Sequence, residues 1–267
     1  MASGTMRFYS VCRSGQTNVR YVIPNDLMEE MKVGNPHYER PMKTLILLHG
    51  FSGNESDWQF IGMAEDIAFR YNMAVFMPDG GNNFYLDRES SSAKYGTYVG
   101  KELVDYVRKT FGLSDKREDT FIGGLSMGGF GALHTALAFP ETFAGAVALS
   151  SALVIHELRE MKEGDANMLA NMAYYKEVFG DMKTAHTTDK NPEVLFDSIV
   201  KAGGVMPRIY MACGTEDFLY NNNIQFRDFV AAHRRPQDDF LYEEGPGIHE
   251  WRFWNEYIFR GMDWILS

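Results

Sequence analysis

A serine inside the pentapeptide GLSMG, residues 124–128, is the side chain of this sequence best placed to act as a nucleophile. The apolar stretch DTFIGG precedes it and GFGALHTALAFP follows it, so Ser126 is predicted at a sharp strand-to-helix turn. Such a turn strains the serine backbone and exposes its hydroxyl group above the sheet edge. Glycine two residues before and two after avoids clashes with the neighbouring chain. The alternative interpretation is a glycine-rich turn without chemistry.

A serine hydroxyl needs a base, and the base needs a group that orients it. With this kind of turn the chain order is serine, acid, histidine. MACGTEDFLY places Glu216 and Asp217 just after one predicted strand, and GPGIHEW places His249 after the next. Catalytic groups gather at the carboxyl ends of strands in open α/β sheets. From position alone, either carboxylate could be the acid.

The other six histidines fit the role of the base less well. His134 lies inside the helix predicted after the serine, and His49 precedes the serine in the chain. His156 begins HELRE, which lacks the second histidine of the H-E-x-x-H zinc motif. The others lie before the core strands, between predicted strands or at a helix end: His37, His186 and His233. We therefore predict no metal site and no cofactor.

The elements that must position these residues alternate between strand and helix. KTLILLHG and MAVFMPDG are continuous apolar runs, typical of strands buried on both faces. MRFYSVCR and NVRYVIP alternate with period two around SGQ and predict an N-terminal hairpin. We expect one α/β domain over residues 1–267, with a mostly parallel sheet of about eight strands and helices on both faces. Residues 151–204 contain helical pieces but no clear strand, and are predicted to be a helical insertion that forms a lid or pocket wall.

Composition excludes several other classes. A net charge of -10 repels phosphate backbones, so no nucleic-acid partner is expected. The two cysteines, Cys12 and Cys213, lie far apart and indicate no disulfide framework. No apolar run is long enough to span a membrane, and MASGTMRFYS lacks the features of a signal peptide. We expect a cytoplasmic protein with no membrane partner; a homo-oligomer is left open.

Four stretches, LLHGFSGNESDW, FIGGLSMGGFGAL, CGTEDFLYNNN and GIHEWRFW, together resemble the esterase D-like branch of the α/β-hydrolases. Within that branch, the chain is most similar to the bacterial tributyrin esterase and acetyl esterase group. The resemblance implies an α/β-hydrolase fold with Ser126 as the nucleophile, Asp217 as the acid and His249 as the base. It also implies that the backbone N–H groups of Phe51 and Met127 form the oxyanion hole, in agreement with the positions expected from topology.

The expected activity is hydrolysis of short-acyl, acetyl-type esters of small molecules by a serine carboxylesterase. Trp58, Tyr85 and Trp251 could wall an acyl or alcohol site, although such side chains are more often part of the core or the rim. Alternatives are a feruloyl esterase or an S-formylglutathione hydrolase. Residues 50–53 read GFSG where S-formylglutathione hydrolases usually carry a Gly-Leu-Thr-Cys-like segment, which lowers the second alternative. An acyltransferase and a catalytically inactive binding protein are further alternatives.

Overall fold

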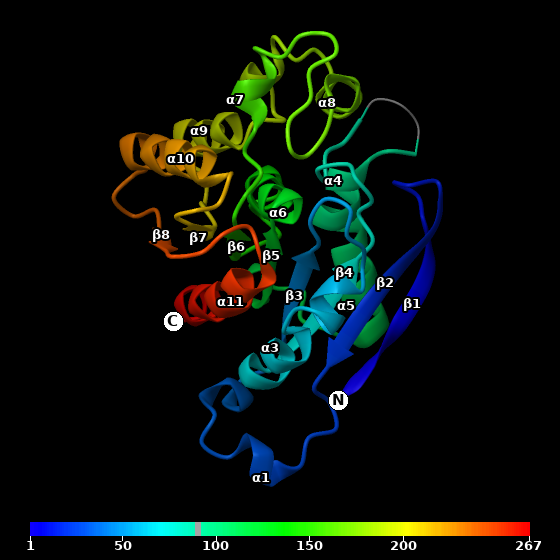
Figure 1. Ribbon diagram of the computed structural model, residues 1–267. Coiled ribbons are helices and arrows are strands. Elements are labelled where there is room, and N and C mark those ends of the chain that lie inside the picture. Colours follow the sequence, from blue (N-terminus) through cyan, green and yellow to red (C-terminus); the bar gives the residue numbers. More distant parts are fainter. Residues whose placement is uncertain (89–91) are drawn as a thin grey trace.

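Eight strands form a single sheet in the computed structural model, which describes residues 1–88 and 92–267 (Figure 1). The strand order is β1-β2-β4-β3-β5-β6-β7-β8. β1 pairs antiparallel with β2, and β2 with β4, whereas all other neighbours are parallel. The strands are β1 (Ala2–Ser10), β2 (Gly15–Ile23), β3 (Lys43–Leu48), β4 (Met73–Pro78), β5 (Thr120–Leu125), β6 (Gly145–Leu149), β7 (Arg208–Gly214) and β8 (Phe240–Gly245). The predicted α/β-hydrolase fold, with its N-terminal hairpin, is confirmed.

The central strands are buried on both faces, which explains why they are apolar without interruption. In β3, Ile46 and Leu48 face one hydrophobic cluster, whereas Leu45 and Leu47 face the other. The first cluster is covered by α5 (Leu103–Phe111), α6 (Met127–Ala138), α9 (Pro192–Ala202) and α10 (Tyr220–His233). The second is covered by α3 (Ala64–Tyr71) and α11 (Trp251–Ile265). Helices therefore lie on both sides of the sheet, as predicted.

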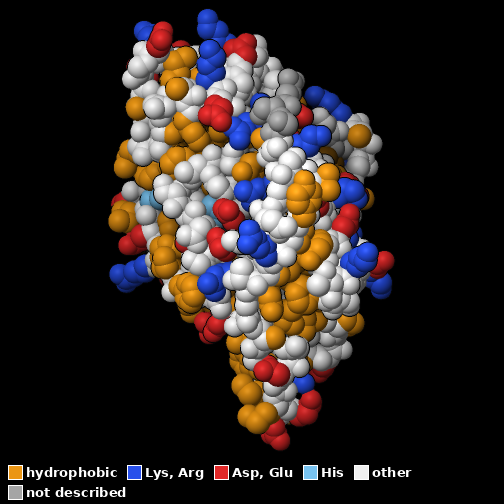
Figure 2. Space-filling view, turned by 90° about the vertical axis from the view of Figure 1, so that its right-hand side faces the viewer, with side chains coloured by type: hydrophobic (Ala, Val, Ile, Leu, Met, Phe, Trp, Pro, Cys, Tyr) orange, Lys and Arg blue, Asp and Glu red, His pale blue; other side chains and the backbone are white. Residues whose placement is uncertain are grey.

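Short helical segments complete the part of the chain that the structure describes. They are α1 (Glu29–Lys32), α2 (Asp57–Phe60), α4 (Tyr95–Thr97), a π-helical turn (Tyr98–Glu102) and 3-10 turns at Pro36–Glu39, Arg117–Asp119 and Ala185–Thr187. Figure 2 shows the face that carries the hairpin, where apolar, acidic and basic side chains are interspersed. None of the described helices has the length and apolar character needed to cross a membrane.

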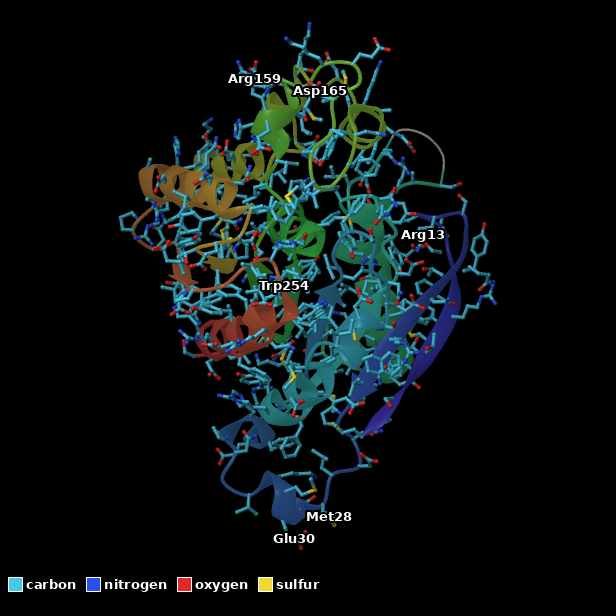
Figure 3. The ribbon with its side chains drawn as sticks, in the orientation of Figure 1. Arg13, Met28, Glu30, Arg159, Asp165 and Trp254 are labelled. Carbon is cyan, nitrogen blue, oxygen red and sulfur yellow. The ribbon has the colours of Figure 1, made fainter. Side chains whose placement is uncertain are left out.

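The predicted insertion divides into two parts in space. α7 (Ile155–Leu158) and α8 (Met172–Phe179) lie above the sheet, whereas α9 packs against α6 and α10 as part of the helical layer (Figure 1). Figure 3 shows Arg159 and Asp165 at the outer end of the insertion, far from Trp254 near the middle of the molecule. The projecting segment is therefore the part of the predicted insertion, residues 151–204, that precedes α9.

A carboxylate fastens the N-terminal hairpin to the rest of the domain. Glu102, at the end of the π-helical turn, accepts the N–H of Val11 at 2.6 Å and the hydroxyl of Ser10. Ser10 is fully buried, so its hydroxyl needs a partner inside the protein. Nearby, Phe8 stacks on Tyr106 with ring centroids 4.0 Å apart. The hairpin is thus held by both polar and aromatic contacts.

We expect Glu102→Ala to lower the free energy of unfolding by about 1–3 kcal/mol, because it leaves polar groups of the hairpin turn without their acceptor. Urea unfolding followed by circular dichroism measures the change. Asp105→Ala is the control, since it removes only the exposed ion pair with Lys101 and should cost about 0.5 kcal/mol or less. Equal losses in the two variants would show that Glu102 does not anchor the hairpin.

Candidate active site

Ser126 lies between β5 and α6 in a backbone conformation that L-residues rarely adopt. Its φ is 56° and its ψ is -120°. Such strain costs on the order of 1–3 kcal/mol and persists only where surrounding contacts impose it. Here the N–H of Ser126 donates to the carbonyl of Leu149 at 2.8 Å, and its own carbonyl accepts the N–H groups of Ala152 and Phe130, each at 3.0 Å. β6 and α6 therefore fix the serine from both sides.

The two glycines of the pentapeptide lie where the chain approaches itself most closely. A Cβ on Gly124 would lie 2.3 Å from the carbonyl oxygen of Gly128. A Cβ on Gly128 would lie 2.2 Å from the carbonyl oxygen of Leu48 and 2.6 Å from that of His49. These neighbours are backbone atoms of the turn and of the end of β3, so they cannot move aside cheaply. The close approach explains why glycine is needed at both positions.

Ser126, His249 and Asp217 form an unbroken hydrogen-bonded chain, although they come from three separate loops. The Ser126 hydroxyl lies 3.0 Å from Nε2 of His249. Nδ1 of His249 lies 2.9 Å and 3.1 Å from the two carboxylate oxygens of Asp217. One of these oxygens also accepts the N–H of Leu219 at 2.9 Å. The side chain of Asp217 is fully buried, and these donors compensate the cost of burying its charge.

Two aromatic rings pack against the imidazole of His249. Trp254 meets it edge-to-face at 4.9 Å between centroids, and Phe218 lies 4.6 Å away on a tilted plane. The indole N–H of Trp254 donates to the hydroxyl of Ser150 at 3.0 Å, which fixes the orientation of the indole. Neither aromatic residue is among those predicted for the site from the sequence. For Trp254 the available signal is its position three residues after Trp251 on a predicted helix.

Glu216, the second candidate for the acid, points away from the imidazole and holds the loop that carries it. Its carboxylate accepts the N–H of Gly247 at 2.6 Å, and its own N–H donates to the carbonyl of Gly247 at 3.0 Å. The first of these bonds lowers the pKa of the Glu216 carboxyl. Glu216 therefore joins the loop after β7 to the loop after β8, two residues before His249.

The two N–H groups expected to form the oxyanion hole belong to Met127, directly after Ser126, and to Phe51, in the loop after β3. Met127 is the first residue of α6, where N–H groups lack partners inside the helix. Phe51 follows β3, two residues after His49. The carbonyl oxygen of His49 would lie 2.6 Å from a Cβ on Gly128, so this loop runs close to the turn at Ser126. Within residues 1–88 and 92–267, neither N–H donates to a protein acceptor. Both groups are thus available to an oxyanion, and the N-terminus of α6 adds favourable potential there.

The three aromatic residues expected to wall the pocket are placed very differently. Trp58 is 1% exposed and donates its indole N–H to the carbonyl of Leu48, whereas Tyr85 is fully buried with its hydroxyl on the carbonyl of His49. Neither offers surface to a ligand, and they support the end of β3 from opposite faces of the sheet. Trp251 is half-buried, edge-to-face between Trp58 and Trp254. Trp251 therefore matches the alternative interpretation of these aromatic residues, in which they belong to the core or the rim and do not wall the pocket.

His49 is close to the site but is arranged as a structural residue. Its Nε2 accepts the N–H of Gly80 at 2.9 Å, so its Nδ1 carries the proton that it donates to the carbonyl of Gly50 at 2.8 Å. Burial lowers its pKa. The neutral ring, hydrogen-bonded through both of its nitrogens, fixes the turn that precedes Phe51. Across the described residues, no group of three or more histidine, cysteine or acidic side chains is arranged to hold a metal ion.

The projecting insertion touches the same turn through α8. The ring of Tyr174 meets that of Phe51 edge-to-face at 5.3 Å, and its hydroxyl donates to the carbonyl of Asn82 at 3.0 Å. Burial raises the pKa of Tyr174. The Asn82 side chain in turn accepts the N–H of Ser52 at 2.8 Å. α8 therefore borders the site on the side of Phe51.

Known proteins resemble this chain over nearly its whole length. The family described as "Putative esterase" matches residues 25–265. An acetyl esterase from Caldicellulosiruptor saccharolyticus is 40% identical over 265 residues, which cover 99% of this chain and 98% of the relative. The chain belongs to this esterase family.

Solved structures place the esterase among serine hydrolases. FphF of Staphylococcus aureus, a fluorophosphonate-binding serine hydrolase, is 29% identical with a TM-score of 0.82, covering 100% of this chain and 98% of its own. An S-formylglutathione hydrolase from the same organism is 29% identical with a TM-score of 0.81, covering 100% and 99%. The protein is therefore a carboxylic ester hydrolase of the serine hydrolase type.

We expect Gly128→Ala to lower both stability and esterase activity, the latter by about a hundredfold, because the added methyl forces the start of α6 away from Leu48 and misplaces the N–H of Met127. Thermal unfolding and turnover of an aryl acetate measure the two effects. Gly15→Ala is the matched control, since its Cβ would meet only Arg13, at 3.8 Å. An active, stable Gly128→Ala enzyme would contradict the close approach.

Asp217→Asn should reduce kcat/KM by about a thousandfold or more, since it removes the charge that orients and stabilises the imidazolium. Glu216→Gln should cost about tenfold or less, because a side-chain oxygen remains to accept the N–H of Gly247. Steady-state kinetics on an aryl acetate compare the two. A larger loss in Glu216→Gln would reverse the assignment of the acid.

Proposed function

We propose that this esterase hydrolyses short-acyl, acetyl-type esters through a Ser126–His249–Asp217 triad and an acyl-enzyme intermediate. The observation that carries the proposal is the continuous hydrogen-bonded chain from the buried carboxylate to the serine hydroxyl, which lies at the N-terminus of α6. The short-acyl preference is supported by the 40% identity to an acetyl esterase.

In the acylation step, His249 Nε2 takes the proton of the Ser126 hydroxyl, 3.0 Å away, as the oxygen attacks the ester carbonyl. The carbonyl oxygen becomes an oxyanion and is held by the N–H groups of Phe51 and Met127. His249 then gives the proton to the leaving alcohol oxygen. The C–O bond to the alcohol breaks, and the acyl group remains on Ser126.

Deacylation repeats these steps with water as the nucleophile. His249 removes a proton from the water, whose oxygen attacks the acyl carbonyl in the same oxyanion hole. Collapse of the intermediate releases the carboxylic acid and returns the proton to Ser126. Asp217 keeps the Nδ1–H tautomer of His249 and stabilises its charged form in both steps. No step requires a metal ion or an organic cofactor.

A second candidate activity is thioester hydrolysis, as in an S-formylglutathione hydrolase. The similarity to the Staphylococcus aureus enzyme of that name favours it. The same triad would act on either ester, because the chemistry at the carbonyl carbon is unchanged. The two activities differ in the leaving group, so substrate kinetics separate them.

A fluorophosphonate probe should label Ser126, and Ser126→Ala should abolish labelling and reduce turnover by about a hundred thousandfold or more. Ser198→Ala on α9 is the matched control and should retain both. Labelling is read by mass spectrometry of the intact protein. Unchanged labelling of Ser126→Ala would show that Ser126 is not the nucleophile.

A panel of aryl acetate, aryl butyrate, methyl ferulate and S-formylglutathione should show the highest kcat/KM on the aryl acetate. Preference for S-formylglutathione or methyl ferulate would replace the proposed substrate class while leaving the triad intact. Product analysis with added alcohols gives the partition between hydrolysis and acyl transfer, and predominant transfer would mark an acyltransferase.

A further inference from the structure

Two exposed apolar residues adjoin the acid and the base in the chain, and one of them, Phe218, packs on the imidazole of His249. Phe218 is 40% exposed and Ile248 is 53% exposed, although the reacting groups beside them are mostly buried, with Ser126 only 3% exposed. Phe218 directly follows Asp217, and Ile248 directly precedes His249. Single exposed apolar residues are ordinary on a protein surface. A pair that borders the base of a hydrolase calls for a reason.

The Phe218 ring rests on the imidazole, and the backbone that leads into Ile248 is tied by hydrogen bonds. Phe218 lies within the turn closed by Asp217, whose carboxylate accepts the N–H of Leu219 at 2.9 Å. Its ring rests against the imidazole at 4.6 Å. Ile248 follows Gly247. The N–H of Gly247 donates to the Glu216 carboxylate, and its carbonyl accepts the N–H of Glu216. The pair is therefore a preformed apolar border rather than a loosely placed one.

The reaction itself determines which half of the ester lies beside this border. The leaving oxygen must come within hydrogen-bonding distance of His249 Nε2 to receive its proton. The alcohol group attached to that oxygen therefore lies along the imidazole, whereas the carbonyl oxygen points to Phe51 and Met127. Trp254 and Asp217 already occupy other sides of the ring. Phe218, which also contacts the ring, and its exposed neighbour across the two loops, Ile248, are the apolar side chains available to the alcohol group.

We propose that Phe218 and Ile248 form an apolar subsite for the alcohol half of the ester, which selects aryl and other apolar alcohols. This inference rests on the proposed function. An aromatic alcohol buries apolar surface against both side chains and meets the Phe218 ring. A hydroxyl-rich alcohol loses hydrogen bonds with water there and gains no partner from either side chain.

The test compares mutant and native kcat/KM for acetates that differ only in the alcohol. With benzyl acetate, Phe218→Ala and Ile248→Ala should each lower kcat/KM about tenfold. With ethyl acetate, which is too small to reach the subsite fully, the loss should be about twofold or less. Val205→Ala, an exposed apolar residue elsewhere at 67% exposure, is the control and should change neither value.

The rate of deacylation separates an alcohol subsite from a merely structural role, because the alcohol has already left and only weaker support of His249 would slow this step. All acetates give the same acetyl-enzyme, so its hydrolysis rate, measured after rapid acylation, reports on His249 without any alcohol group. In Phe218→Ala this rate should fall by no more than kcat/KM does with ethyl acetate. Equal losses on both acetates, together with slower deacylation, would mean that Phe218 only supports His249. A loss that grows with acyl length, from methyl acetate to methyl hexanoate, would place the pair in an acyl site instead. Either result overturns the proposal.

The outcome is separate from that of the proposed function. Fluorophosphonate labelling of Ser126 in the native protein and in both variants tests the triad without any alcohol group. Absent labelling in the native protein would remove the proposed mechanism itself. Normal labelling with no difference between benzyl and ethyl acetate in the variants would remove only the alcohol subsite.

Discussion

The reaction centre depends on the close contact of the backbone with itself at Ser126. The end of β3 passes so near the start of α6 that position 128 has no room for a side chain. This packing holds Ser126 at a φ of 56°, and the next residue, Met127, carries the first N–H of α6. The contact therefore fixes the proposed nucleophile and one proposed oxyanion donor at once. Preorganised donors of this kind need no rearrangement as charge develops.

The acid and the base depend on a different constraint, the parallel pairing of β7 with β8. Gly214 and Gly245 are paired in register, so the loops that follow them leave the sheet side by side. Glu216 bridges these loops through Gly247, and Asp217 meets His249 just beyond. The order of strands thus brings together residues 32 positions apart in the chain. Trp254, from α11, completes the enclosure of the imidazole.

The sequence predicted the fold and the convergence of Ser126, Asp217 and His249 because strand ends and glycine-rich turns are local patterns. It did not distinguish the roles of Glu216 and Asp217 without a family resemblance, since the choice depends on which carboxylate faces the imidazole. It also could not place Trp58 and Tyr85, because an aromatic residue after a strand can point into the core as readily as toward a ligand. Their burial follows from tertiary packing around the end of β3. The sequence also could not show that α9 belongs to the helical layer, because this depends on its tertiary contacts with α6.

In the proposed mechanism, the two halves of an ester lie against different parts of the chain. The base and its apolar neighbours Phe218 and Ile248 come from the loops after β7 and β8, whereas Phe51 comes from the turn that contacts Tyr174 of the insertion. Changes in the insertion can therefore alter the surroundings of Phe51 while the pairing of β7 with β8 remains intact. Phe218 and Ile248 adjoin the acid and the base in the chain, so a backbone change at either position also displaces a catalytic group. A new alcohol preference is consequently reached more easily by replacing these two side chains than by inserting or deleting residues beside them, since replacement leaves the backbone of the acid and the base in place.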